Sequence, residues 1–340
     1  MGVNTQNKWN RGVDFLSKVY TAGNWSVKDD DWSEMFLLQN LKQFWLPEEI
    51  SLSGDLLSWE EMSSDEQSTY MKVLGGLTLL DTIQGDVGMP EIAGSVESHQ
   101  QKAVLSFMGA MENAVHARSY SNIFLTLASQ DEITKAFKWI ESNKHLQKKA
   151  DIIHKHYEKA KAGSRDSYMA KVASVALESF LFYSGFFYPL YLAGQGILRN
   201  SGEIISLIIR DESIHGVFVG LLAQKDVLNN PIELANVEED VYEMFDELLE
   251  NEIKYTRELY DSIGLTHDAV DFVKYNANKA LANLGFDERY SHDRVNPIVL
   301  NGLDTSSTAI DFFSTKGQMY KKPTVVAIRD EDFYFDDVAT

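Results

Sequence analysis

The sequence predicts an all-α protein in which long helices pack as a bundle around a buried site. Only six prolines occur in 340 residues, so few positions interrupt a helix. Apolar residues recur with a period of about 3.6 along most of the chain, and alternating strand patterns are nearly absent. The length of 340 residues is enough for one large domain or two ordinary ones, and the 44% of hydrophobic residues allow a large core.

The first half of the predicted bundle has three helical segments. The first begins with S-S-D-E, in which Ser63 and Glu66 form a capping box. Its apolar pattern continues through Asp81, so this carboxylate lies inside a helix of mostly apolar character. The third segment is amphipathic and is expected to be an outer helix. The expected ranges are 63–80, 99–127 and 131–161.

The second half begins with the most apolar segment of the chain, residues 172–192. It has about the length of a membrane span, but it contains Glu178, Pro189 and three tyrosines, and no second stretch resembles it. A central helix of a bundle is therefore the better interpretation, and no membrane contact is expected. The helices expected in this half cover residues 170–192, 202–227, 237–263 and 267–284.

The composition limits the possible partners and ligands. The formal net charge of −20 argues against nucleic acid and anionic membranes as partners. Because the chain has no cysteine, any metal must be held by oxygen and imidazole, which suits iron or manganese. The polar N-terminus has no apolar core of a signal peptide, so we expect a cytoplasmic protein.

Both ends of the chain differ from the predicted bundle over residues 35–301. Residues 1–34 form an N-terminal extension without an assigned role. From residue 302 to residue 340 helical periodicity is lost, and the sequence predicts a flexible tail. The tail ends in D-E-D-F-Y-F-D-D, whose three adjacent aromatic residues favour binding to a partner over a disordered end without a role.

Two helices each carry a glutamate just before a histidine. The pairs are Glu112 with His116 and Glu212 with His215, and residues three or four apart share one helix face. Asp81 and Glu178 add one carboxylate from each of two other helices. Four carboxylates around two divalent metals give a neutral cluster, so the set predicts a di-metal carboxylate site inside the bundle. Such a site indicates oxidation chemistry.

Each part of this pattern also has a simpler interpretation. Glu178 alone fits a protonated or salt-bridged core glutamate, and a single Glu–His pair often occurs by chance on a solvated face. The combination of two pairs and two further acids on four apolar helices favours the metal site.

Tyr120 lies one turn after His116, on the helix face that also carries Glu112. A tyrosine one turn from an oxidising metal pair could lose an electron and a proton. Without the metal site it would be a core tyrosine. Three apolar side chains at helical spacings from the ligands could form a dry pocket that protects a radical: Phe182, Phe186 and Ile208.

Several strings resemble one known family, and together they are specific. They are F-W-L-P-E-E-I from Phe44, L-T-L-L-D-T-I-Q from Leu77, M-E-N-A-V-H-A-R-S-Y-S from Met111, L-E-S-F-L-F-Y-S-G-F from Leu177, I-I-R-D-E-S-I-H-G from Ile208 and Y-N-A-N-K-A-L from Tyr275. They resemble the small, radical-generating subunit of class I ribonucleotide reductase, subclass Ib. The resemblance covers the chain from about residue 35 to its end.

This resemblance implies a ferritin-like helical bundle that forms a homodimer and binds two Mn or two Fe ions per chain. It implies that one metal is bound by Asp81, Glu112 and His116, and the other by Glu178, Glu212 and His215, with Glu112 and Glu212 able to bridge. It also implies a stable radical on Tyr120.

The resemblance further implies a radical route to a second protein. Trp45 and Asp211 match the positions that relay the radical outward, and Tyr320 matches the tail tyrosine that passes it to the large subunit. The terminal aromatic cluster would dock on that large subunit, where ribonucleotides would be reduced. In subclass Ib a small flavodoxin-like protein supplies superoxide to the manganese form.

One spacing departs from the pattern of many members, which have Glu-x-x-His in the first pair. Here Glu112 and His116 are four residues apart, and a single-turn π-bulge would absorb the extra residue. All six ligand types are retained, which argues against the metal-free branch of the family.

Two other functions remain open for the same bundle. A di-iron oxidase or hydroxylase would need an open substrate pocket and would not need Trp45, Tyr320 or an aromatic tail. A ferritin-type iron store would be shorter and would assemble into a shell.

Overall fold

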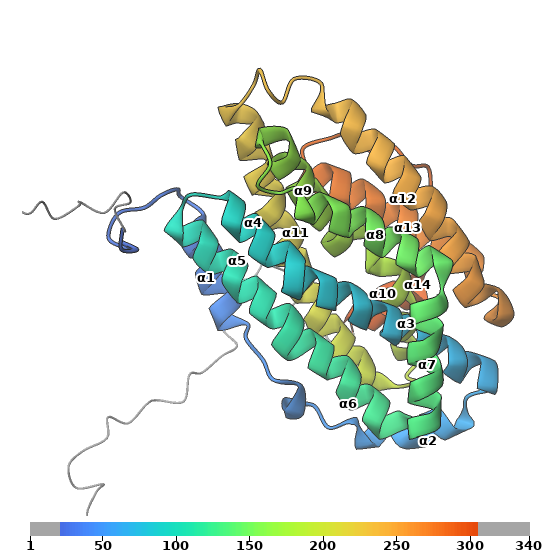
Figure 1. Cartoon of the computed structure of the whole chain (residues 1–340). Helices are drawn as coiled ribbons and strands as arrows, with labels where there is room; N and C mark the ends of the chain where they lie inside the picture. The colour runs from blue at the N-terminus through green and yellow to red at the C-terminus, as the bar shows by residue number, and fades with distance from the viewer. Residues whose placement is uncertain (1–20, 305–340) are drawn as a thin grey trace, which may run out of the picture.

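A computed structural model of the chain describes residues 21–304. Within that range every regular element is a helix, and the long helices lie side by side in a bundle (Figure 1), which confirms the all-α prediction. The α-helices are α1 Ser33–Lys42, α2 Leu56–Glu61, α3 Ser64–Ile83, α4 Met89–Ser95, α5 His99–Met111, α6 Ala117–Leu127, α7 Gln130–Ser142, α8 Lys144–Glu158, α9 Ser164–Ala176, α10 Tyr183–Gly194, α11 Arg199–Asn229, α12 Val237–Tyr260, α13 Thr266–Asn283 and α14 Pro297–Asp304. Short 3-10 turns are η1 Pro47–Glu49, η2 Leu52–Asp55 and η6 Asp261–Ile263.

Four long helical rods form the centre of the bundle. Three of them are built from two α-helices joined by a π-helical turn, and the fourth is the uninterrupted α11. The rods contact one another, because α11 packs against α9 and α10, and α3 packs against α6 and α10. Outer helices cover them: α1 lies against α5, α7 against α3, and α12 against α8 and α13 (Figure 1). The composite rods are α3–η3–α4, α5–η4–α6 and α9–η5–α10.

The rod α9–η5–α10 is the buried centre of the protein. Every residue from 168 to 190 is buried, on all sides of the helix. A helix that is apolar all round is stable only when other helices cover it completely. The segment 172–192 is therefore a central helix, as predicted. No helix in residues 21–304 is both long enough and apolar enough to cross a membrane.

Helix α3 begins with the capping box that the sequence predicts. The Ser63 side chain accepts the backbone N–H of Glu66, and the Glu66 carboxylate accepts the backbone N–H of Ser63 at 2.8 Å. Asp81 lies in the last turn of this helix, as expected.

The expectation of one helix over residues 131–161 is wrong, because α7 ends at Ser142 and α8 begins at Lys144. Between them Asn143 has an extended backbone, with ψ of 111°. Its side-chain oxygen accepts the backbone N–H groups of His145 and Leu146 at 3.1 and 2.9 Å, which caps α8. A single asparagine thus ends one helix and starts the next.

Three π-helical turns interrupt the central rods, each close to a predicted ligand. Turn η3 (Gln84–Gly88) begins three residues after Asp81. Turn η4 (Glu112–His116) runs from one predicted ligand to the next, and η5 (Leu177–Leu181) contains Glu178. A π turn holds one residue more than the α-helical turn it replaces. The expected π-bulge at Glu112–His116 is therefore present.

Two predicted segments fall mostly outside the described residues. The tail expected from residue 302 is described only to the end of α14, so Tyr320 and the aromatic cluster Phe333, Tyr334 and Phe335 lie outside that range. The first twenty residues of the predicted N-terminal extension also lie outside it.

Candidate metal centre

The structure brings together all six residues that the sequence predicts as metal ligands. Asp81 comes from α3, Glu178 from η5, and the two Glu–His pairs come from η4 and α11. All six side chains are completely buried. Their donor atoms form two groups, and within each group the atoms lie within 4.8 Å of one another. The first group is Asp81, Glu112, His116 and Glu212, and the second is Glu112, Glu178, Glu212 and His215.

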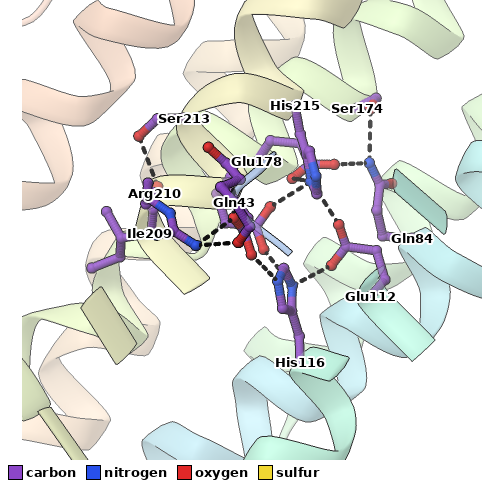
Figure 2. A network of polar contacts seen from close by, with 12 residues as sticks. Gln43, Gln84, Glu112, His116, Ser174, Glu178, Ile209, Arg210, Ser213 and His215 are labelled. Atoms are coloured by element: carbon purple, nitrogen blue, oxygen red, sulfur yellow. Dashed lines mark hydrogen bonds and ion pairs between the residues drawn. The ribbon is translucent and has the colours of Figure 1, made fainter. Parts of the chain in front are cut away.

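Two glutamates belong to both groups and lie between the two imidazoles. Glu112 Oε1 lies 2.8 Å from His215 Nδ1, and Glu112 Oε2 lies 3.0 Å from His116 Nδ1 (Figure 2). Glu212 Oε1 lies 2.9 Å from His116 Nδ1, and Glu212 Oε2 lies 3.3 Å from His215 Nδ1. Each carboxylate therefore presents one oxygen to each histidine. This is the arrangement needed by a ligand that bridges two metal ions.

The buried polar atoms of this cluster fit a pair of cations. Both oxygens of Asp81 and both oxygens of Glu212 lack a hydrogen-bond partner, as do Glu112 Oε1, Glu178 Oε2 and both ring nitrogens of His215. Several of these atoms nevertheless lie close to one another, as Glu112 Oε1 does to His215 Nδ1 at 2.8 Å. Each buried polar group without a partner lowers the stability of the fold by about 1–3 kcal/mol if it is neutral, and by more if it is charged. Two divalent ions would be bound by these atoms and would balance four carboxylates. The donor set of carboxylate oxygen and imidazole nitrogen suits manganese or iron.

The pKa values of the cluster are shifted because its acidic side chains are buried and close together. Burial raises the pKa of Asp81 well above its usual range, and the charges of Glu112 and Glu212 raise it further. Burial and the same two neighbours raise the pKa of Glu178. For His116, burial acts to lower the pKa, but the charges of Glu112 and Glu212 outweigh it, so the pKa lies well above its usual value. Without metal, the cluster therefore retains protons that bound cations would replace.

A second layer of contacts joins His116 to Trp45 through Asp211. His116 Nε2, the ring nitrogen that faces away from the cluster, lies 3.2 Å from Asp211 Oδ2. The same oxygen accepts the indole N–H of Trp45 at 2.8 Å. The rings of Trp45 and His116 are nearly parallel, with centroids 6.4 Å apart. The carboxylate orients the imidazole so that its Nδ1 faces the metal groups, which is the usual role of a carboxylate behind a histidine ligand.

Tyr120 lies in α6, one turn beyond His116, and it is completely buried. Burial raises the pKa of its phenol well above the ordinary value, and the neighbouring carboxylate of Asp81 raises it further. The phenol is therefore neutral at any physiological pH. Phe182, Phe186 and Ile208 are also completely buried, as expected for a dry interior.

Some polar residues around the cluster were not predicted from the sequence. Gln43 Nε2 donates to the other oxygen of Asp211 at 2.7 Å, and Arg210 donates to the backbone carbonyl of Gln43 at 2.7 Å (Figure 2). Gln84 donates to Glu178 and Ser174. Gln84 and Ser174 had a local signal, since they lie three residues after Asp81 and four residues before Glu178 on the same helical rods. Arg210 directly precedes Asp211, and only Gln43 comes from a distant segment.

Comparison with known proteins identifies the family. The family model for the ribonucleotide reductase small chain matches residues 22–297. The chain is 57% identical over 325 residues to the ribonucleoside-diphosphate reductase subunit beta of Bacillus subtilis, covering 95% of this chain and 98% of the relative. It is 42% identical over 326 residues to the Escherichia coli ribonucleoside-diphosphate reductase 2 subunit beta, covering 94% and 99%.

A solved structure agrees with these relatives. The dimanganese(II)-NrdF of Streptococcus sanguinis superimposes with a TM-score of 0.80 at 43% identity, covering 84% of this chain and all of that one. Together with the buried carboxylate and histidine cluster, this likeness also confirms the ferritin-like bundle. The chain therefore belongs to the ribonucleotide reductase small-chain family, in its subclass Ib, as a small subunit of ribonucleoside-diphosphate reductase.

Proposed function

We propose that this chain holds two Mn or two Fe ions in the buried cluster, stores a radical on Tyr120, and passes it to the large subunit of the reductase. The observation that carries the proposal is the pair of donor groups that share Glu112 and Glu212. Asp81, Glu112 and His116 would hold one ion, and Glu178, Glu212 and His215 the other. Manganese is supported by the Streptococcus sanguinis relative, which is described as a dimanganese(II) protein.

When bound, the metal pair supplies an oxidant that takes one electron from a phenol. Tyr120 must lose its proton in the same event, because burial and Asp81 keep its pKa high. Asp81 is the carboxylate whose charge acts most strongly on this phenol, so we propose that it accepts the proton. The buried surroundings exclude water, which protects the resulting neutral radical.

The route outward begins at His116 and continues through Asp211 to Trp45. When an electron moves inward from Trp45, its indole N–H becomes acidic. Asp211 Oδ2 already accepts this N–H at 2.8 Å, so it is placed to hold the proton. Removing the charge of Asp211 would break the route without altering a ligand.

The last steps of the route require the partner. We propose that the tail from residue 302 docks on the large subunit through Phe333, Tyr334 and Phe335, and that Tyr320 relays the radical. Ribonucleotides would be reduced on the large subunit, because this chain has no cysteine. A flavodoxin-like activator would supply the oxidant for manganese. This function places the protein in the cytoplasm with its nucleotide substrates, without nucleic acid as a ligand.

A homodimer is also part of the proposal, and an exposed apolar face supports it. Met35, Leu38 and Leu41 form a stripe on α1, and between 45% and 53% of each side chain is exposed. Phe44 and Leu46 extend the stripe beyond the end of the helix. Contiguous exposed apolar groups of this kind mark interfaces, and we propose a second copy of this chain as the occupant. Leu38→Glu should then shift the sedimentation coefficient of the full chain from dimer to monomer, whereas Leu228→Glu, at an exposed leucine on α11, should leave a dimer.

Electron paramagnetic resonance tests the central proposal. The chain is loaded with Fe(II) in air and, separately, with Mn(II) and a superoxide source, and bound metal is measured. We expect two metals per chain and a tyrosyl signal that Tyr120→Phe removes. Tyr188→Phe is the matched control, because Tyr188 is a buried tyrosine of α10 outside both donor groups. Bound metal without any organic radical would contradict the radical function and favour an oxidase.

A further inference from the structure

A buried chain of hydrogen bonds, formed by side chains of three different elements, ends on the ligand Glu178. The Tyr157 hydroxyl of α8 donates to Gln84 Oε1 in η3. Gln84 Nε2 then donates to Glu178 Oε1, and it also donates to Ser174 Oγ of α9 at 2.8 Å (Figure 2). Tyr157, Gln84 and Ser174 are all completely buried. This row of hydrogen bonds therefore has no contact with solvent at either end.

The direction of these bonds follows from the two ends of the Gln84 amide, because Oε1 faces the Tyr157 hydroxyl and Nε2 faces Glu178. Burial and then the charge of Glu178 raise the pKa of the Tyr157 phenol well above its ordinary value, so the hydroxyl keeps its proton. An amide has a carbonyl at one end and two N–H donors at the other. Because the phenol donates to the carbonyl oxygen of Gln84, the amide nitrogen faces Glu178. When Glu178 is deprotonated, as a metal ligand must be, the reversed amide would point its oxygen at a carboxylate oxygen, and the two would repel.

As a consequence, the two oxygens of Glu178 differ in their contacts. Oε1 is occupied by the Gln84 amide. Oε2 has no hydrogen-bond partner and lies 3.6 Å from His215 Nδ1, inside the second donor group. The support of the first group comes instead from Asp211, whose Oδ2 lies 3.2 Å from His116 Nε2.

The absence of a side chain at Gly88 allows Tyr157 and Gln84 to approach each other. Gly88 is the last residue of η3, one turn after Gln84. A Cβ atom at Gly88 would lie 2.7 Å from Tyr157 Cε2 and would also collide with Gln84 Oε1. Any side chain at this position would push the ring and the amide apart, so a glycine is required by close approach and not by backbone angles.

We infer that Tyr157 and Gln84 are a positioning pair that fixes the orientation of Glu178 and thereby sets the affinity of the second donor group for its metal. The inference rests on the proposed metal centre and adds residues that do not touch the metal. Partners behind a metal ligand typically change affinity by about 10- to 100-fold when they are removed. The loss should fall mainly on the ion of the second donor group, because Glu178 belongs to that group alone.

The test is an Mn(II) titration of the full-length metal-free chain, in which the resonance signal of free Mn(II) gives both stoichiometry and affinity. Four variants are compared with the parent chain: Tyr157→Phe, Gln84→Met, the double variant, and Tyr188→Phe as the matched loss of a buried hydroxyl. Thermal unfolding of each metal-free variant checks the fold. We expect Tyr157→Phe and Gln84→Met each to weaken binding of one ion by about 10- to 100-fold, and Tyr188→Phe to bind as the parent does.

The double variant makes the test specific to a route through Gln84. If Tyr157 acts only through that amide, the double variant binds no more weakly than Gln84→Met alone. It also removes both partners of the Tyr157–Gln84 hydrogen bond, so neither of these two polar groups is left buried without the other. Losses that add in the double variant, or parent-like affinity in Tyr157→Phe and Gln84→Met, would overturn the inference.

Failure of the metal centre itself gives a different result. A parent chain that binds no Mn(II), or a His215→Ala variant that binds two ions as tightly as the parent, would overturn the proposed centre. Parent binding that is lost in His215→Ala but unchanged in Tyr157→Phe and Gln84→Met would overturn only the positioning pair.

Discussion

Trp45 and Asp211 are 166 residues apart in the sequence, yet the indole N–H of Trp45 donates to Asp211 Oδ2 at 2.8 Å in the interior of the protein. The same oxygen lies 3.2 Å from His116 Nε2. One carboxylate atom therefore connects a predicted metal ligand to an aromatic ring near the surface helix α1. This shared oxygen allows a direct test of the proposed outward route.

Asp211→Asn should abolish most of the reductase activity with the large subunit while a tyrosyl radical still forms. An amide oxygen in the place of Oδ2 carries no charge and cannot take up a proton from Trp45, and the amide nitrogen would face the N–H donor of Gln43. We expect a loss of about 10- to 100-fold or more in turnover, in line with the loss of a partner behind a ligand. Turnover and radical content are measured on the same preparation. The control is Gln43→Met, which removes only the bond to the other oxygen of Asp211 and should have a smaller effect. Equal losses in both variants would argue against a special role for Asp211 Oδ2.

Metal binding should release protons, and its affinity should rise with pH. The raised pKa values of Asp81 and Glu178 mean that the metal-free cluster keeps protons where isolated carboxyls would have lost them. A bound cation needs these groups deprotonated, so protons and metal compete, and lower pH favours the protons. Calorimetric Mn(II) titrations in two buffers with different ionisation enthalpies measure the number released. A heat that does not depend on the buffer would contradict this expectation.

A buried ion pair outside the metal centre should matter for stability. Lys149 Nζ lies 2.9 Å from both oxygens of Glu252, both side chains are almost completely buried, and the ammonium lies 3.9 Å from the ring centroid of Tyr255. Lys149→Met leaves Glu252 as an uncompensated charge and should cost about 3–5 kcal/mol in the free energy of unfolding. Replacing both residues by methionine should recover most of that loss.

The neighbouring residue supplies the control for this prediction. Lys148 Nζ lies 2.9 Å from Glu247 Oε1, but both side chains are about half exposed. Lys148→Met should therefore change the unfolding free energy by at most about 1 kcal/mol. Urea denaturation of the metal-free chains measures both effects. A similar cost at the two lysines would show that burial does not decide the strength of these pairs.

The π turn at η4 leads to a prediction about chain length. Deleting the exposed Asn113 removes the extra residue of the turn and leaves a continuous α-helix with Glu-x-x-His spacing. The helices before and after the turn keep their faces, so the variant should fold and still bind metal. Deleting Ala103, in the regular part of α5, rotates the helix on one side by about 100° and should prevent folding. Circular dichroism and metal content distinguish the two deletions. Loss of the fold in both would show that η4 does not simply absorb one residue.

The sequence by itself determined the helical class, the six buried side chains of the candidate metal centre and the central position of the apolar segment. These features depend on helical periodicity and on residues three or four apart, which local geometry places on one face. The π turn at Glu112–His116 was expected only from the resemblance, because this spacing is one residue longer than the Glu-x-x-His of many family members. The break at Asn143 was not predicted, since asparagine also occurs inside helices and only its bonds to the next turn reveal the cap.

Only the tertiary structure decided which distant side chains support the ligands. Tyr157 lies 73 residues from Gln84, and Gln43 lies 168 residues from Asp211. Neither pair has a periodic signal, because these contacts depend on how separate helices pack against each other. The difference in contacts between the two oxygens of Glu178 also depends on how these helices pack. A sequence fixes which atoms are available within one helix, whereas packing of the bundle decides which of them meet, because contacts between helices depend on rotation and distance that no local pattern encodes.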